Sequence, residues 1–111
     1  MPRTRVEVDG GVCGYATVIS VSRLTPARVG IVLESQCPMV SACAASLSSF
    51  DWRSALDLRQ DESLPHVMSR HIRHTGCPVV AAVAKAVEVE VGAYLPLDAH
   101  IRFARTPPVR E

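Results

Sequence analysis

The chain has few aromatic side chains and almost no lysine. Among its 111 residues are one Trp, two Tyr and two Phe, and a single Lys accompanies eleven scattered Arg. A nucleic-acid surface usually combines a stripe of basic residues with aromatic side chains on which bases stack. The composition therefore predicts no nucleic-acid partner.

Long apolar runs are also missing. No stretch approaches the roughly 20 uncharged apolar residues that span a bilayer, and the opening MPRTRVEVDG contains no signal-peptide core. We therefore expect no membrane partner and a cytoplasmic location.

The residues that are present predict one folded domain over residues 1–111. Hydrophobic residues make up 48% of the chain and charged residues 21%, and the formal net charge is +1, which argues against disorder. A chain of this length buries only one modest core, so a separate catalytic module has no room. The proline-containing stretch 106–111 is predicted to be a frayed tail.

Alternating and β-branched residues predict a small antiparallel sheet. Segments 3–8 and 12–23 flank the turn-forming Asp9-Gly10-Gly11 and are expected to form a hairpin. A third strand is predicted at Arg28–Ser35, and a last strand at 99–105, which reads AHIRFAR.

Three to four helices are expected to cover one face of this sheet, which gives an α+β fold. Asp51 and Ser63 are typical N-cap residues, and Gly76 and Gly92 are placed to end helices. The predicted helices cover residues 38–48, 52–56, 64–74 and 78–91.

The last of these helices is ambiguous in the sequence. VEVEV alternates like a strand, but the preceding Ala-rich half propagates helix well. We predict a helix whose apolar face holds Val80, Val83, Val87 and Val91.

Four cysteines, Cys13, Cys37, Cys43 and Cys77, are the candidate functional residues. A reducing cytosol seldom supports structural disulfides, so metal binding or catalysis is the better interpretation. A Cys-Pro step occurs twice, at Cys37 and Cys77, each time where a helix is predicted to begin. A thiolate at such an N-cap faces free backbone N–H groups and the positive end of the helix dipole, which lowers its pKa. The alternative is that proline merely starts helices while cysteine fills small gaps in the core.

The spacing of the cysteines favours an iron–sulfur cluster over structural zinc. Structural zinc usually shows a close C-x-x-C pair, which is absent, whereas Cys-Pro closes the cysteine run of bacterial ferredoxins. We predict a [4Fe–4S] cluster for electron transfer, redox sensing or sulfur chemistry, served by a redox partner protein. The predicted ligands are Cys13, Cys37, Cys43 and Cys77.

The position of Cys43 leaves two interpretations open. It lies six residues after Cys37, a rise of about 9 Å on a regular helix, which makes ligation of one small site difficult. Cys43 is then either a ligand of a wide cluster or a core residue. In the second case the other three cysteines converge and leave one iron open for water, substrate or a histidine.

Two other functions use the same residues. In a Cys-dependent enzyme, a low-pKa Cys37 or Cys77 is the nucleophile and His74 is the acid or base. In an interaction module, zinc stabilises the fold through the same thiolates. A homo-oligomer is compatible with each of the three functions.

The motifs GGVCG, SQCP and HTGCP together resemble those of small uncharacterised four-cysteine proteins of bacteria and archaea. The resemblance spans most of the chain and implies no particular activity.

Overall fold

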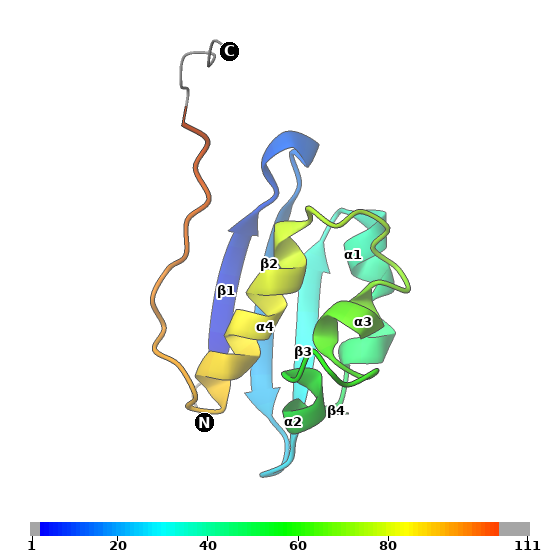
Figure 1. The fold of residues 1–111 in the computed structure, drawn as a ribbon, viewed down its shortest axis with the longest axis vertical. Coiled ribbons are helices and arrows are strands. Elements are labelled where there is room, and N and C mark those ends of the chain that lie inside the picture. Colours follow the sequence, from blue (N-terminus) through cyan, green and yellow to red (C-terminus); the bar gives the residue numbers. More distant parts are fainter. Residues whose placement is uncertain (1–2, 105–111) are drawn as a thin grey trace, which may run out of the picture.

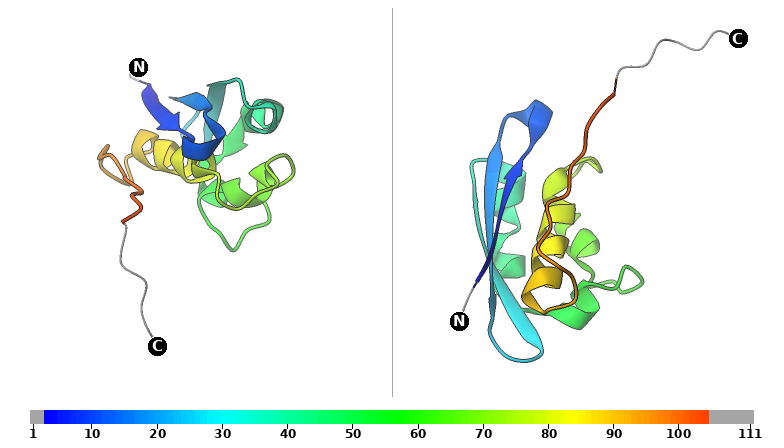
Figure 2. Two further views of the ribbon diagram at one scale, coloured as in Figure 1. Left: turned by 90° about the horizontal axis from the view of Figure 1, so that it is seen from above. Right: turned by 90° about the vertical axis from the view of Figure 1, so that its left-hand side faces the viewer.

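One four-stranded antiparallel sheet organises the part of the chain that the computed structural model describes, residues 3–104 (Figure 1). The helices lie on one face of the sheet and leave the other face open, as the edge-on view in Figure 2 shows. The predicted α+β class is confirmed. The strands, in spatial and sequence order, are β1 (Thr4–Asp9), β2 (Ala16–Arg23), β3 (Arg28–Ser35) and β4 (Phe50–Asp51).

The predicted hairpin joins β1 to β2 through a short 3-10 helix, η1 (Gly11–Cys13). The side chain of Asp9 closes the turn, because its Oδ1 accepts a hydrogen bond of 2.9 Å from the Gly11 N–H. Gly11 and Gly14 have φ of 73° and 75°, a region that other residues rarely adopt. The turn residues therefore have the conformations that the sequence pattern predicts.

The predicted C-terminal strand at 99–105 is wrong for its described residues, 99–104, which have no regular structure. Alternation produces a strand only where a sheet edge is paired with it. The fourth strand is instead β4, a two-residue strand missed by the sequence analysis, in which Phe50 pairs with Val29 of β3.

Each predicted helix begins where expected, but two are shorter. Helix α1 (Pro38–Ala42) ends early and is followed by the 3-10 helix η2 (Ala44–Leu47), which leads to β4. Helix α3 (Leu64–Met68) ends in a turn, in which the His71 and Ile72 N–H groups both donate to the Met68 carbonyl. This turn returns Ile72 to the core. The helical elements are α1 (Pro38–Ala42), η2 (Ala44–Leu47), α2 (Trp52–Ala55), α3 (Leu64–Met68) and α4 (Pro78–Glu90).

The two predicted glycine caps have different outcomes. Gly92 follows α4 with φ of 81°, as predicted, whereas Gly76 is not left-handed. The physical reason is that α3 ends at Met68, so Gly76 lies in a separate turn and does not cap that helix.

The core lies between the sheet and α4, which packs across β1 and β2. Val83 and Val87 are fully buried, as predicted, but Val80 and Val91 are only half-buried. The sheet determines which stripe of α4 is buried, and this stripe is rotated from the predicted one. It consists of Val79, Val83, Ala86 and Val87.

The predicted tail, 106–111, lies outside the described residues. Within residues 3–104, no helix combines the length and apolar character needed to cross a bilayer.

Candidate functional site

The topology places the cysteines toward one end of the domain. In an antiparallel sheet, the turn between β1 and β2 lies at the same end as the end of β3. Cys13 lies in that turn and Cys37 directly follows β3. Helix α4 also begins at this end, which brings in Cys77 (Figure 1).

Cys37 and Cys77 have the same local structure. Each is the N-cap of a helix and each is followed by proline in the first turn. Their backbone angles nearly coincide, with φ and ψ of −71° and 119° at Cys37 and −68° and 117° at Cys77. Neither side chain makes a capping hydrogen bond, so neither sulfur is engaged by the backbone of its own helix. The predicted N-cap positions are confirmed.

Cys43 lies at the end of α1 and is fully buried. Its thiol donates a weak hydrogen bond to the Met39 carbonyl, with 3.5 Å between Sγ and oxygen. Burial raises the pKa of Cys43, and the negative charges of Cys77 and Cys37 raise it further. Cys37 and Cys43 belong to the buried core and Cys77 packs against it, and we name these three residues the three-thiol group.

Cys13 stands apart on the exposed tip of the hairpin. Its sulfur lies over Gly10, where a Cβ atom would collide with it. Within residues 3–104, no set of three or more His, Cys, Asp or Glu side chains is spaced to hold one metal ion. The structure places Cys37, Cys43 and Cys77 in or against one core and Cys13 on the exposed hairpin tip, and the ligand set stays a prediction.

The donors at this end of the domain are thiols, which both zinc and iron–sulfur clusters bind. Thiolates around one zinc lie about 4 Å apart, because each Zn–S bond is about 2.3 Å long. A cubane cluster holds its thiolates farther apart and is bound by cysteine thiolates. The residue types therefore fit a cluster, and the choice between a cluster and a single ion stays a prediction.

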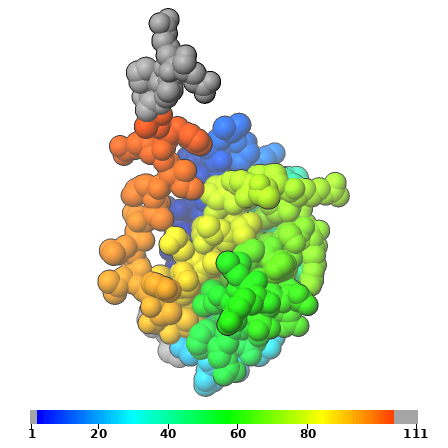
Figure 3. Space-filling model, viewed as in Figure 1, coloured from blue at the N-terminus to red at the C-terminus, as the bar shows by residue number. Residues whose placement is uncertain are grey.

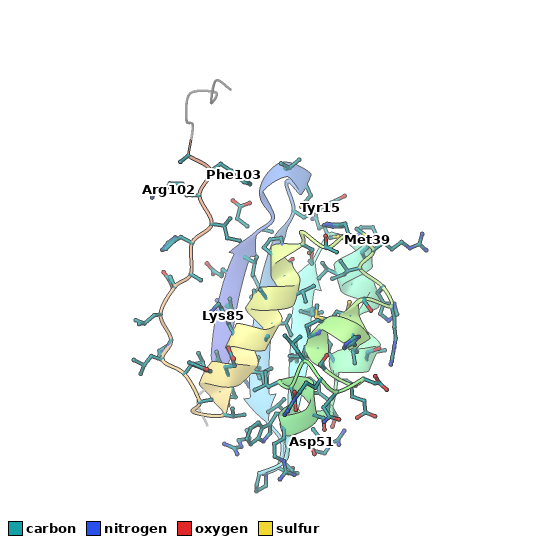
Figure 4. All side chains as sticks on the ribbon, in the orientation of Figure 1. Tyr15, Met39, Asp51, Lys85, Arg102 and Phe103 are labelled. Atoms are coloured by element: carbon teal, nitrogen blue, oxygen red, sulfur yellow. The ribbon has the colours of Figure 1, made fainter. Side chains whose placement is uncertain are left out.

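A shallow depression of about 520 Å³ separates the hairpin tip from the start of α1. Its walls come from the beginning of β2 and the end of β3, directly beside Cys13 and Cys37 in the sequence. Tyr15 lies at this end of the molecule, as does Met39 of α1 (Figure 4). The lining residues are Gly14, Tyr15, Ala16, Glu34, Ser35 and Gln36.

A second depression, of about 330 Å³, has a basic wall that the sequence analysis missed. Arg70, His71 and Arg73 face Pro38 and the rest of α1 across it, so it adjoins the helix that Cys37 caps. The signal in the sequence is the dense run RHIRH at residues 70–74.

His74 lies outside this wall. It is exposed, in the irregular stretch that precedes Cys77. Its predicted role as ligand, acid or base stays a prediction.

Comparison with known proteins adds a family but no activity. The model of the Family of unknown function (DUF6951) matches residues 4–103. No curated protein and no solved structure matches the chain.

Proposed function

This chain belongs to the DUF6951 family, and we propose that it is a small iron–sulfur protein whose cysteine thiolates hold a [4Fe–4S] cluster. The observation that carries the proposal is the three-thiol group. Two of its members, Cys37 and Cys77, cap different helices in nearly the same backbone conformation. A thiolate at either position faces the free backbone N–H groups at the start of its helix.

Electrostatic repulsion within the three-thiol group supports a cationic occupant. The pKa of Cys43 is raised by burial and by the charges of Cys77 and Cys37, so the Cys43 thiol resists ionisation. Iron ions would compensate the negative charge of the thiolates, and their binding would release the remaining protons. When bound, the cluster supplies one-electron transfer or an open iron for sulfur chemistry.

Cys13 and Cys43 compete for the role of fourth ligand. Cys43 shares the core with Cys37, but its sulfur is buried and its thiol donates to the Met39 carbonyl. Cys13 is exposed on the hairpin tip, at the same end of the sheet as the start of α1. We retain all four thiolates in the proposal, because a test by substitution separates the two cases.

The basic wall beside α1 suggests which partner would exchange electrons with the cluster. Arg70 and Arg73 are exposed and lie across the depression from the helix that Cys37 caps. A positive surface steers acidic partners to its own position and raises their association rate. We therefore propose a redox partner protein with an acidic docking surface.

Anaerobic preparation with iron and sulfide tests the cluster. We expect a brown protein with about four iron and four acid-labile sulfides per chain. Cys37→Ala and Cys77→Ala should lose most of the cluster, because each removes a thiolate from the three-thiol group. Ser41→Ala, a substitution at an exposed hydroxyl of α1, is the matched control and should retain it.

Comparison of Cys13→Ala with Cys43→Ala identifies the remaining ligand or ligands. Loss of the cluster in both variants supports four thiolates, and loss in one supports an open site with three. A colourless protein with stoichiometric zinc would contradict the proposal in favour of an interaction module. A metal-free protein with one rapidly alkylated thiol would contradict it in favour of a Cys-dependent enzyme.

A further inference from the structure

The C-terminal segment, residues 95–103, has the pattern of a strand but no partner. Its apolar side chains occupy alternate positions and are almost fully exposed, at 75% for Leu95, 76% for Leu97, 83% for Ile101 and 95% for Phe103. Figure 3 shows the segment set off from the body of the molecule. Figure 4 shows Arg102 and Phe103 on opposite sides of it, as expected for an extended chain.

This exposure is concentrated rather than scattered. Together with Tyr94, the segment supplies half of the exposed large hydrophobic residues among those that the structure describes. Pro96 lies in a tight turn in which the Leu97 N–H donates to the Leu95 carbonyl. From Leu97 on, the intervening positions carry Asp98, His100 and Arg102, so this part of the segment has one apolar side and one polar side. Such a segment matches a sheet with one covered face and one open face.

The molecule has an unpaired sheet edge at β1, because the strand order places β1 at the end of the sheet. The Gly10 N–H donates to the Tyr15 carbonyl, which sets the alternation of main-chain directions in the hairpin. By this alternation the main-chain groups of Arg5 and Glu7 point away from β2, toward solvent. An added strand could form hydrogen bonds with these main-chain N–H and C=O groups.

The side chains at this edge match the two sides of the segment. Val6 and Val8 point toward the helices and are only half-buried, as is Val91 on α4. Arg5 and Glu7 lie on the open face and form an ion pair of 3.4 Å. An added strand would place its apolar residues beside the valines and its polar residues beside the ion pair.

We propose that the C-terminal segment pairs with β1 of a second copy of this chain, and that the two copies exchange their segments reciprocally. Each copy carries both a donor segment and an acceptor edge, so the reciprocal exchange closes into a two-fold dimer. Within one copy, the segment leaves α4 at Gly92 and stays off its own β1, exposed along its length.

The expected interface has the size of a stable dimer. The six residues of β1 leave Leu95 beyond the paired stretch, so three large apolar side chains from each copy (Leu97, Ile101 and Phe103) are covered, and together they remove on the order of 800 Å² from water before the main chain is counted. Stable interfaces bury about 1,200 to 2,000 Å². The paired strands supply the remainder.

Light scattering coupled to size exclusion on the full chain tests the proposal, and we expect a dimer. Ile101→Asp, on the apolar side, should weaken dimerisation by more than about 100-fold, since a charge would be buried without a partner. His100→Asp is the matched control. His100 is next to Ile101 in the sequence but lies on the polar side of the segment, so this substitution should change the dissociation constant less than about threefold. Both side chains are exposed in the monomer, so circular dichroism should show an unchanged fold.

A second measurement distinguishes exchange from other contacts. In a mixture of isotope-labelled and unlabelled chains, we expect nuclear Overhauser contacts between Ile101 of one copy and Val6 or Val8 of the other. Glu7→Pro removes an outward N–H of β1 and should abolish these contacts, while Glu7→Ala should retain them. A monomer at all concentrations, or a dimer whose contacts are only within one chain, would overturn the proposal.

Discussion

At the scale of the single residue, burial gives the four cysteines different properties. Cys13 is exposed, Cys77 is half-buried, and Cys37 and Cys43 are buried. An exposed thiol is open to oxidants and alkylating reagents, whereas a buried thiol is protected and behaves as a small apolar group. One residue type therefore contributes to the surface, the candidate site and the core of the same molecule.

Cys43 should make the stability of the metal-free, reduced chain depend on pH. Its pKa is raised in the folded state, so above the ordinary thiol pKa of about 8.5 the unfolded chain releases a proton that the folded chain retains. The contribution of this thiol is complete below that pH and is lost as the pH rises. We expect Cys43→Ala to cost about 1 to 2 kcal/mol near neutral pH in urea unfolding, and less at higher pH.

Cys13→Ala is the control for this measurement, because Cys13 is exposed and its loss should leave the free energy of unfolding nearly unchanged. A cost for Cys43→Ala that stays constant above the thiol pKa would contradict the assignment.

Ser63 should tolerate loss of its hydroxyl, although it is an N-cap. It precedes α3, but its buried Oγ makes no hydrogen bond within the described residues and does not cap the helix. A buried hydroxyl without a partner costs roughly 1 to 3 kcal/mol. We expect Ser63→Ala to leave the free energy of unfolding unchanged or to raise it by up to about 1 kcal/mol.

Thermal unfolding of Ser63→Ala alongside Asp51→Ala checks this expectation. Asp51 accepts a hydrogen bond of 2.9 Å from the Arg53 N–H, so its loss should destabilise α2. A larger loss of stability in Ser63→Ala than in Asp51→Ala would show that the Ser63 hydroxyl has a partner.

At the scale of the element, close approach of the backbone determines where β3 meets η2. Gly30 of β3 lies against the carbonyl of Ser48, which directly follows η2. A Cβ atom at Gly30 would lie 2.5 Å from that carbonyl oxygen and 3.2 Å from a methyl group of Leu24. The glycine is required by this packing and not by its backbone angles.

Gly30→Ala should therefore be destabilising. The new methyl group has to push η2 away from the sheet, which we expect to cost about 1 to 3 kcal/mol in urea unfolding. Gly76→Ala is the matched control, because a Cβ there meets no atom within 4 Å and its φ is not left-handed. It should be neutral or stabilising by about 0.4 to 1 kcal/mol, and similar effects in the two variants would contradict the packing argument.

At the scale of the whole molecule, one core holds together elements from most of the chain. Sixteen buried hydrophobic residues form a single cluster that includes members of β2, β3 and all four helices. Cys37 and Cys43 belong to it, so the candidate site and the core are physically continuous. A change in the core should consequently affect the cysteine end.

Met68→Ala should show how strongly the core depends on α3. Met68 is fully buried, and α3 packs on α4. We expect a cost of about 2 to 5 kcal/mol, measured by urea unfolding, because the cavity has little freedom to collapse. Met39→Ala at a partly exposed position should cost clearly less, and equal costs would show that α3 is held by other contacts.

The sequence by itself determined the hairpin, the third strand and the starts of the helices. Period-two alternation and the Asp-Gly-Gly turn predict the hairpin, and β3 has the predicted bounds, Arg28–Ser35. Proline after cysteine predicts both N-caps, at Cys37 and Cys77, because proline fits the first helical turn. These features depend on neighbours in the chain, so local patterns are sufficient to predict them.

Only the tertiary structure decided which of these pieces meet. It placed Cys37 and Cys43 in the core with Cys77 packed against it, left Cys13 on the hairpin tip, and gave the fourth strand to Phe50–Asp51. It also left residues 99–104 unpaired despite their alternation. The physical reason is that contact between residues distant in the sequence depends on the path of the whole chain and on which surfaces remain free. A local sequence pattern contains neither piece of information.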